Sequence, residues 1–560
     1  MLWVEPMPVW CYKYFNAVKS TAPFVLGIFL LLLTFHASAT VRYVDLNCTN
    51  ATPPFTDWTT AATNIQDAVN AANFGDVVKV MDGIYNSGGR LTGDGTSNRV
   101  AVTQAILIQS VNGSGLTLID GGHALRCVYL TNGAALMGFT LTNGNAGNGG
   151  GVACVSTNSL IANCLLINNT ASSGGGAYLG TLTNCMVSGN VCPPTGGNGG
   201  GATGSILNNC TLSGNVTGKP YPNTTGSTWG GGANACILNN CTLTGNKAYG
   251  AGATGGGANG CVLFGCVLAN GYADQFGGGA YNCNATNCNI SNNSAGYGGG
   301  GVSGGIYCNC LLTGNGYTGF GGAVYWTTTL NNCVVTGNLA GRGGGGYGCT
   351  FNNCIVYYNT YGGDNYSDSV NYCCTPDATG VGCFTNAPLF ADGVYHLQAS
   401  SPCINAGKNV LAGTATDLDG NPRIRGGTVD IGAYEFQSPS SILSYFWAQQ
   451  YGLPTDGSAD FTDPDSDGLN NWQEWIAGTV PTNSLSVLKM FSPSNNVPGL
   501  KVSWQSVSGK TYFLQRSTNL LAQPAFSSIK SNLVGALNST TYSDTTATNG
   551  GPYFYRVGVQ

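Results

Sequence analysis

Charged residues are scarce in this chain, which excludes several classes of function. Only 8% of the 560 residues are charged, and the formal net charge is −5. Nucleic-acid binding requires a basic face, so we exclude DNA and RNA as partners. Histidine occurs only at His36, His123 and His396, and no Cys-x2-Cys pair is present. A zinc site therefore lacks its usual ligand set.

Long apolar runs are also absent beyond the N-terminal segment. The run 24–33 follows Lys13 and Lys19 and precedes the small residues 37–39. This order is typical of a signal peptide, and the run is shorter than the roughly 20 residues of a membrane span. We expect cleavage after residue 39 and an exported bacterial protein, secreted or attached to the outer membrane, with no integral membrane span. The alternative is an uncleaved N-terminal anchor.

Glycine, cysteine and asparagine are abundant, and they follow a repeat. The chain has 87 Gly and 23 Cys. A Gly-rich block such as 230–232 precedes nearly every copy of the motif Asn-Cys-x4-Asn, and a degenerate copy stands at Gly265-Cys266. The motif occurs eight times, with its cysteine at Cys164, Cys185, Cys210, Cys241, Cys288, Cys310, Cys333 and Cys354.

Units of this kind predict a stacked all-β fold. The runs between the Gly and Asn corners are too short for helices, and Gly and Asn suit the positive-φ corners of tight turns. One unit cannot bury its own apolar side, so neighbouring units must stack. Parallel connections are almost always right-handed. We therefore predict a right-handed parallel β-helix with about 4.8 Å between coils.

Two segments, 168–178 and 292–301, resemble the Gly-Gly-Ala and Asn-bearing repeats of polymorphic outer-membrane proteins and autotransporter-like adhesins. The resemblance covers roughly Val77 to Asn405 and implies a surface-exposed β-helix. It says less about function, because β-helices host lyases, hydrolases, epimerases and adhesins alike.

The ends of such a stack need caps, because open strand edges invite aggregation. We expect an N-terminal cap at 40–76, with a short amphipathic helix that presents Ile65, Ala68, Val69 and Ala72 on one face. The β-helix itself is expected at 77–400 and a closing coil at 401–438. Residues 417–436 resemble the closing segment of secreted bacterial β-helix proteins. The alternative for this segment is a sugar or ion site built from Asp417, Asp419 and Asp430.

The cysteines are expected to form two vertical columns. Equivalent positions of adjacent coils lie within the Cα range that disulfides tolerate. The cysteines could therefore form disulfide bridges between coils or remain buried thiols. Stacked side chains keep neighbouring Cβ vectors parallel, which favours buried thiols for the Asn-Cys column. The second column comprises Cys236, Cys261, Cys283 and Cys349, with occasional bridges.

Catalytic groups are missing from the middle of the repeat. Between Arg126 and Asp364 the charged residues are Lys219, Lys247, Asp274 and Arg342, which fall in separate coils and offer no carboxylate pair. A later acidic region could supply a site, although a solvated surface is the more common explanation. It comprises Asp364, Asp368, Asp377, Asp392 and His396.

Aromatic residues recur just before the glycine blocks. At one or two per coil they predict a stripe along one edge of the stack, and aromatic faces bind the apolar faces of sugars. This suggests a ridge that binds glycans or a cell-surface protein. The alternative is that the rings only pack on each other and shield the glycine corners. The residues are Trp229, Tyr249, Tyr272, Phe276, Tyr297, Tyr317 and Phe320, with Arg342 next in the series.

The stretch 463–474 fits a twelve-residue calcium loop. Gly468 makes the turn at position 6, and 442–452 is a candidate entering helix. The segment 439–484 resembles single EF-hand or dockerin-like linkers of secreted bacterial proteins, although a dockerin carries two copies. The predicted ligands are Asp463, Asp465, Asp467, the carbonyl of Leu469, Asn471 and a bidentate Glu474.

The final segment, 485–560, alternates apolar and polar residues and predicts a small β-sandwich that resembles fibronectin type III domains. Taken together, the sequence favours a non-enzymatic exported or cell-surface protein that binds a glycan or a partner through an elongated face. The competing hypothesis is a polysaccharide lyase or glycoside hydrolase of pectate-lyase-like fold.

Overall fold

The computed structural model describes residues 39–194, 196–220, 226–316, 319–495, 498–548 and 551–560. These residues form two compact units. Unit 1 contains the described chain up to Asn386 with 410–423 and 431–434, and unit 2 contains 387–409, 424–430 and 435–560. The predicted signal peptide, apart from Ala39, and Tyr317 lie outside the described residues. Within the described ranges, no helix is long and apolar enough to cross a membrane.

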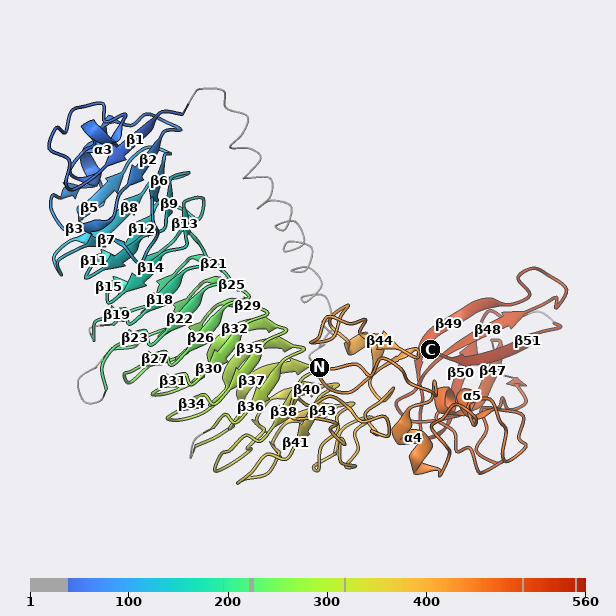
Figure 1. The fold of residues 1–560 in the computed structure, drawn as a ribbon. Helices are drawn as coiled ribbons and strands as arrows, with labels where there is room; N and C mark the ends of the chain where they lie inside the picture. Colours follow the sequence, from blue (N-terminus) through green and yellow to red (C-terminus); the bar gives the residue numbers. More distant parts are fainter. Residues whose placement is uncertain (1–38, 195, 221–225, 317–318, 496–497, 549–550) are drawn as a thin grey trace. The chain divides into compact units, whose positions relative to one another are not determined.

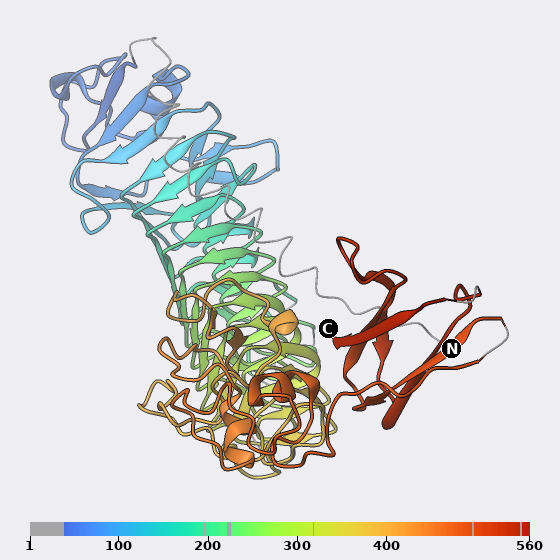
Figure 2. The ribbon, with the colours of Figure 1, turned by 90° about the vertical axis from the view of Figure 1, so that its right-hand side faces the viewer.

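Unit 1 is a parallel β-solenoid, as predicted (Figure 1). The strands of successive coils pair in parallel, and Figure 2 shows the coils stacked one behind the next. One face is a twelve-stranded sheet: β3 (Gly83–Tyr85), β7 (Thr117–Asp120), β10 (Thr140–Thr142), β14 (Leu165–Ile167), β18 (Met186–Ser188), β22 (Thr211–Ser213), β26 (Thr242–Thr244), β30 (Val267–Ala269), β33 (Asn289–Ser291), β36 (Leu311–Thr313), β38 (Val334–Thr336) and β41 (Ile355–Tyr357).

Two further sheets complete the coils. A seven-stranded sheet comprises β11 (Asn145–Asn148), β15 (Thr170–Ser173), β19 (Val191–Cys192), β23 (Val216–Thr217), β27 (Lys247–Ala248), β31 (Tyr272–Ala273) and β34 (Ser294–Ala295). The largest sheet has 24 strands and carries the site described below. Its relevant members are β28 (Ala258–Asn259), β32 (Ala280–Thr286), β35 (Val302–Cys308), β37 (Val324–Asn331), β39 (Gly346–Tyr347), β42 (Asn365–Tyr366) and β43 (Ser369–Asn371).

The first strand of the solenoid lies earlier than the sequence suggested. Strand β1 (Val41–Val44) pairs in parallel with β2 (Val77–Val80). The range predicted as the N-terminal cap, 40–76, therefore already contains a strand of the solenoid. Helix α3 (Ile65–Ala71) stands where an amphipathic helix was expected and buries Ile65, Ala68 and Val69. Its N-cap is Asn64, whose side chain accepts from the backbone N–H of Asp67.

A buried asparagine ladder joins the coils. The backbone N–H and the side-chain Nδ2 of Asn215 both donate to Oδ1 of Asn246 in the next coil, at 3.0 and 2.9 Å. Asn246 in turn donates to the carbonyl of Leu212, and its side chain is inaccessible to solvent. The same arrangement links Asn169, Asn190, Asn215 and Asn246, and again Asn293, Asn315, Asn338 and Asn359.

The prediction that both residues of a Gly-Asn pair form the corner is wrong for the pair Gly245-Asn246. Gly245 has the positive φ of 63° that the corner requires, whereas Asn246 is a ladder rung. In the coil between the two runs the order is reversed. There Asn270 has the positive φ of 56°, and Gly271 stands in the ladder position, where its N–H donates to Asn293.

The glycine blocks mark a place where successive backbones come too close for a side chain. A Cβ atom on Gly231 would lie 2.4 Å from the carbonyl oxygen of Lys247 and 2.5 Å from that of Gly256. On Gly232 it would lie 2.6 Å from the carbonyl oxygen of Gly257. Real Cβ atoms do not approach so closely, so the block is a packing requirement.

A cysteine ladder runs beside the asparagines. Backbone N–H groups donate to Sγ of the next cysteine, as from Cys164 to Cys185 at 3.5 Å and from Cys333 to Cys354 at 3.4 Å. The cysteines of this ladder are thiols, as expected for the Asn-Cys column. The degenerate copy supplies Cys266, and the motif missed two final rungs, Cys373 and Cys383.

The second cysteine column is shorter than predicted. Cys236, Cys261 and Cys283 follow one another through N–H to Sγ hydrogen bonds of 3.4 and 3.3 Å. Gly305 follows Cys283 in the register, and Thr328 follows Gly305, so Cys349 is separated from the other three. Burial raises the pKa of the Cys236 thiol well above its usual range.

Unit 2 contains two short α-helices, a small antiparallel pair of β44 (Ile424–Arg425) with β45 (Thr428–Val429), and two larger antiparallel sheets. Helices α4 (Tyr445–Gln450) and α5 (Asn471–Ala477) flank the predicted calcium loop. One sheet has the order β46 (Ser494–Asn495), β47 (Leu500–Ser506), β50 (Asn538–Asp544), and the other β49 (Ser527–Val534), β48 (Thr511–Ser517), β51 (Phe554–Val559). Val502, Trp504, Tyr512 and Leu514 form a buried cluster between strands of both sheets. The resemblance to fibronectin type III domains stays a prediction.

We expect Asn246→Ala to destabilise the solenoid by about 1–3 kcal/mol, because it leaves buried donors of Asn215 without an acceptor. Thermal or urea unfolding of unit 1 measures the loss. Asn239→Ala, in the same coil but half-exposed, is the matched control with a smaller effect. Equal effects of the two variants would contradict a structural role for the ladder.

Thiol labelling tests the cysteine ladder. In the folded protein we expect Cys383, the half-exposed last rung, to react rapidly with a thiol reagent, and the ten buried rungs to react only after unfolding. Among the described residues Cys48 is partly exposed as well, so Cys383→Ser should remove one of two fast reactions and Cys48→Ser the other. If unfolding without a reductant leaves ladder cysteines unreactive, then they are disulfide-bonded and the assignment is wrong.

Candidate functional site

Aromatic rings of successive coils pack against one another just before the strands of the 24-stranded sheet. Of the predicted stripe, Phe276, Tyr297 and Phe320 come together: the ring centroids of Phe276 and Tyr297 lie 5.3 Å apart, and those of Tyr297 and Phe320 5.6 Å apart. Parallel bridges align Phe276, Gly298, Phe320 and Arg342 in successive coils. The stripe therefore ends at a cation.

A second column of rings lies directly beside the first and was missed by the sequence reasoning. The strand register aligns Tyr281, Ser303, Tyr325, Tyr347 and Tyr366. Rings of Tyr325 and Tyr347 stack at 5.7 Å, and those of Tyr347 and Tyr366 at 5.0 Å with planes only 8° apart. A signal was available, because each of these tyrosines stands one to three positions after a run of glycines.

The two columns are in contact. Phe276 stacks on Tyr325 at 5.6 Å with an interplanar angle of 10°, and Phe320 meets Tyr347 edge-on at 5.1 Å. Phe276, Tyr281, Tyr297, Phe320, Tyr325, Trp326, Tyr347 and Tyr366 are called the aromatic ridge below. The rings pack on one another, as the alternative proposed, yet Tyr297 remains 46% exposed.

A groove opens along the ridge where three strands bulge outward. In β32, β35 and β37 the chain passes through positive-φ residues, among them Asn282, Gly304 and Trp326, and the register between β35 and β37 shifts after Ser303. Trp326 is 55% exposed as a result. The groove has a volume of about 410 Å³ and is lined by Phe276, Tyr281, Asn282, Ser303, Gly304, Tyr325, Trp326 and Thr327.

Hydrogen bonds fix the floor of the groove. The backbone N–H of Gly304 donates to Oγ1 of Thr328 at 2.7 Å, and this hydroxyl donates to the carbonyl of Tyr325 at 2.9 Å. Thr328 is itself buried. The bulge is therefore tied to the solenoid core, and the rings at its edge are held in place.

The remaining predicted ridge residues lie apart from this group. Tyr249 and Tyr272 form a separate pair with ring centroids 5.6 Å apart. Trp229 is 44% exposed and has no ring contact with the other described residues. Tyr317 lies outside the described residues.

The acidic residues of the later coils serve the backbone. Asp364 closes the asparagine ladder by accepting from the N–H and Nδ2 of Asn359, and burial raises its pKa. Asp368 accepts from the backbone N–H groups of Cys349 and Tyr366, and burial raises its pKa to about 7. In unit 2, Asp392 and His396 form an exposed pair at 2.5 Å.

The carboxylates of the closing segment also bind backbone. Asp417 accepts from the N–H groups of Asp419 and Asn421, and Asp430 accepts from those of Asn405 and Phe436. Both carboxylates therefore stabilise the backbone turns of the closing segment, as the first of the two predictions for this segment expected.

Three of the six predicted calcium ligands lie close together in unit 2. Carboxylate oxygens of Asp463, Asp465 and Asp467 lie within 4.8 Å of one another. Glu474 is fully buried, and its Oε2 has no hydrogen-bond partner; the same holds for Oδ2 of Asp465 and of Asp467. Burial, followed by the charges of Asp465 and Asp467, raises the pKa of Glu474 to about 7. This donor set fits a hard divalent cation.

Two details differ from a regular EF-hand. Helix α4 ends at Gln450, well before Asp463, so no helix enters the loop directly. Asn471, expected at position 9, donates from Nδ2 to the carbonyl of Ala459 at 2.8 Å and begins helix α5. Gly468 has the φ of 95° that the sharp turn at position 6 requires.

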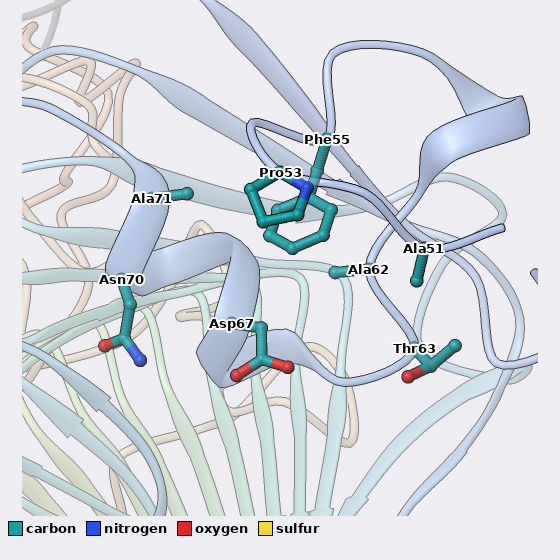
Figure 3. Close-up of a pocket in the computed structure, with 8 residues that line it drawn as sticks. All are labelled: Ala51, Pro53, Phe55, Ala62, Thr63, Asp67, Asn70 and Ala71. Atoms are coloured by element: carbon teal, nitrogen blue, oxygen red, sulfur yellow. The ribbon is translucent and has the colours of Figure 1, made fainter.

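A further pocket of about 460 Å³ lies beside helix α3 (Figure 3) and is lined by Ala51, Pro53, Phe55, Ala62, Thr63, Asp67, Asn70 and Ala71. Its polar groups are engaged locally. Asp67 accepts from Nδ2 of Asn64 at 2.6 Å, and Asn70 accepts from Nε2 of Gln66 at 3.0 Å. We assign it no function.

Comparison with known proteins yields distant likenesses only. No family model matches the chain, and no curated protein matches it. Among solved structures, the pectate lyase Pel9A aligns with a TM-score of 0.34 at 15% identity, over 70% of this chain and 96% of that one. A rhamnogalacturonan lyase aligns with a TM-score of 0.31 at 12% identity, over 60% and 87%.

The tailspike protein gp49 from the Acinetobacter baumannii bacteriophage Fri1, a capsular polysaccharide depolymerase, aligns with a TM-score of 0.24 at 8% identity, over 94% of this chain and 86% of that one. Likenesses this distant transfer no activity to this chain.

Proposed function

We propose that this chain is a non-enzymatic exported or cell-surface protein that binds glycans through the aromatic ridge. The groove beside Tyr325 and Trp326 carries the proposal, since it exposes aromatic faces on a rigid floor. Pyranose rings have apolar faces that pack on such rings, and exposed apolar patches on a soluble protein mark interaction sites. Export and attachment to an outer membrane are part of the proposal and follow from the N-terminal sequence pattern.

The groove supports binding without chemistry. The eight residues that line it include no Asp, Glu, His, Lys or Arg, whereas glycoside hydrolysis and β-elimination both require positioned acid and base groups. The carboxylates of the later coils accept hydrogen bonds from the backbone or from Asn359. We therefore favour a binding protein over a lyase or hydrolase.

Replacing two rings tests the ridge. We expect Tyr325→Ala with Trp326→Ala to weaken binding to glycans identified on an array by about tenfold or more, because two aromatic contacts of about 1 kcal/mol each are lost. Tyr178→Ala is the matched control: Tyr178 occupies the same column of the sheet but has no aromatic neighbour among the described residues.

Two results would contradict this proposal. One is unchanged glycan binding by the double variant when its unfolding midpoint matches that of Tyr178→Ala. The other is release of unsaturated products or reducing ends from uronate-containing polysaccharides by the purified protein, which would identify a lyase or a hydrolase.

We also propose that Asp463, Asp465, Asp467, the carbonyl of Leu469, Asn471 and Glu474 bind calcium. The buried, unpartnered oxygen of Glu474 supports this, because a buried carboxylate without a partner is unfavourable unless a cation neutralises it. Calcium would stiffen the segment between the closing coil and the C-terminal sheets. Lys510 supports the same segment, since its Nζ donates to the carbonyl of Ile476 at 2.8 Å.

Calcium titration of the whole chain tests this site. We expect calcium to bind with a stoichiometry of one and to raise the midpoint of unfolding of unit 2, an effect that a chelator reverses. Glu474→Gln should weaken binding at least tenfold, whereas Asp456→Asn, an exposed carboxylate outside the loop, should leave it unchanged. Equal affinity of wild type and Glu474→Gln would contradict the assignment.

A further inference from the structure

We infer that the glycan bound by the aromatic ridge is anionic and that Arg342 contacts its carboxylate or sulfate group. This inference rests on the proposed function and names the class of ligand. It depends on a feature other than the groove: the aromatic ridge ends in the exposed guanidinium of Arg342, which neighbouring rings hold in place.

Two rings position Arg342. Its Cζ lies 5.9 Å from the ring centroid of Phe320 and 5.8 Å from that of Tyr366. The parallel bridge from Phe320 places Arg342 in the next coil at the same phase of the repeat. A guanidinium stacked on rings keeps its donors in the plane free to bind an oxyanion, with little conformational entropy left to lose.

No carboxylate neutralises this arginine within the described residues. The salt bridges of unit 1 include Arg42–Asp76 and Arg126–Asp94, both in the first coils, and neither involves Arg342. The following coil supplies Asp364 and Asp368, but Asp364 accepts from Asn359 and Asp368 from the backbone of Cys349 and Tyr366. The exposed side chain of Arg342 therefore presents its donors to solvent.

The scarcity of charge makes this position decisive for selectivity. Lys247 lies on β27 of the seven-stranded sheet, away from the ridge strands, and the groove lining carries no charge. An acidic group on a glycan stacked along the ridge therefore meets Arg342 at its end, and the groove lining adds no opposing charge. A bidentate guanidinium suits a planar carboxylate or a sulfate ester equally well, so the two sources have to be separated by experiment.

Matched glycan pairs test the inference. Calorimetry on the full chain compares oligogalacturonate with its methyl ester, which has the same backbone without the charge, and dextran sulfate with dextran. We expect the charged member of at least one pair to bind tenfold or more tightly, and this preference to weaken as salt concentration rises. A preference confined to the first pair identifies a carboxylate ligand, and one confined to the second identifies a sulfate.

Variants assign the preference to one residue. Arg342→Gln should remove the preference and leave the residual binding of the neutral member, Arg342→Lys should retain part of it, and Lys247→Gln should change nothing. The inference is overturned if wild type does not discriminate within either pair, or if Arg342→Gln discriminates as wild type does.

The proposed function fails by a different result. If Tyr325→Ala with Trp326→Ala leaves the binding of every bound glycan unchanged, the ridge is not the binding surface. If that double variant weakens binding to neutral and charged members alike while Arg342→Gln has no effect, the ridge binds glycans and only the anionic selectivity is wrong.

Discussion

The hydrogen bond between asparagines of successive coils is the constraint on which the rest of unit 1 depends. A ladder Asn within a run, such as Asn246, uses its carbonyl oxygen for two donors of the preceding rung and its amide for a core carbonyl. A buried polar side chain is stable only when satisfied, and here the acceptor is the side-chain oxygen of the next Asn or, at the last rung, of Asp364. The corner therefore repeats with a fixed register, and the strands on either side of it are aligned from coil to coil in the same register.

The register explains why aromatic residues can form a surface. Rings at the same phase of successive coils stack at the coil spacing, as Tyr347 and Tyr366 do at 5.0 Å. The glycine block beside them brings backbones together and leaves room at the edge. Where the three strands bulge outward, the side chain of Trp326 is exposed to solvent. A rigid, uncharged platform results, and Arg342 supplies the charge at one end.

Much of this could be predicted from the repeat alone. Periodic Asn-Cys pairs indicated stacked coils and a thiol column, because identical residues at a fixed period must superpose in a solenoid. The second column of rings, which contains Tyr325, was not predicted, because the prediction used only the aromatic residues that precede the glycine blocks and not those that follow them. The groove was beyond prediction, since it depends on the positive φ of Trp326, which no propensity favours. The separation of α4 from the loop likewise depends on tertiary packing.

The interruption at Gly271 has a consequence for how the solenoid comes apart. Nearest-neighbour coupling is what makes stacked repeats melt together, and this coil lacks the amide that passes coupling from Asn246 to Asn293. The side-chain amide coupling is therefore interrupted at Gly271, while the strand pairing and the cysteine ladder through Cys266 continue across this coil. The groove and Arg342 lie in the coils that follow this interruption, so opening of the asparagine ladder in the first coils has no side-chain amide contact through which to pass directly to the ladder beside the aromatic ridge.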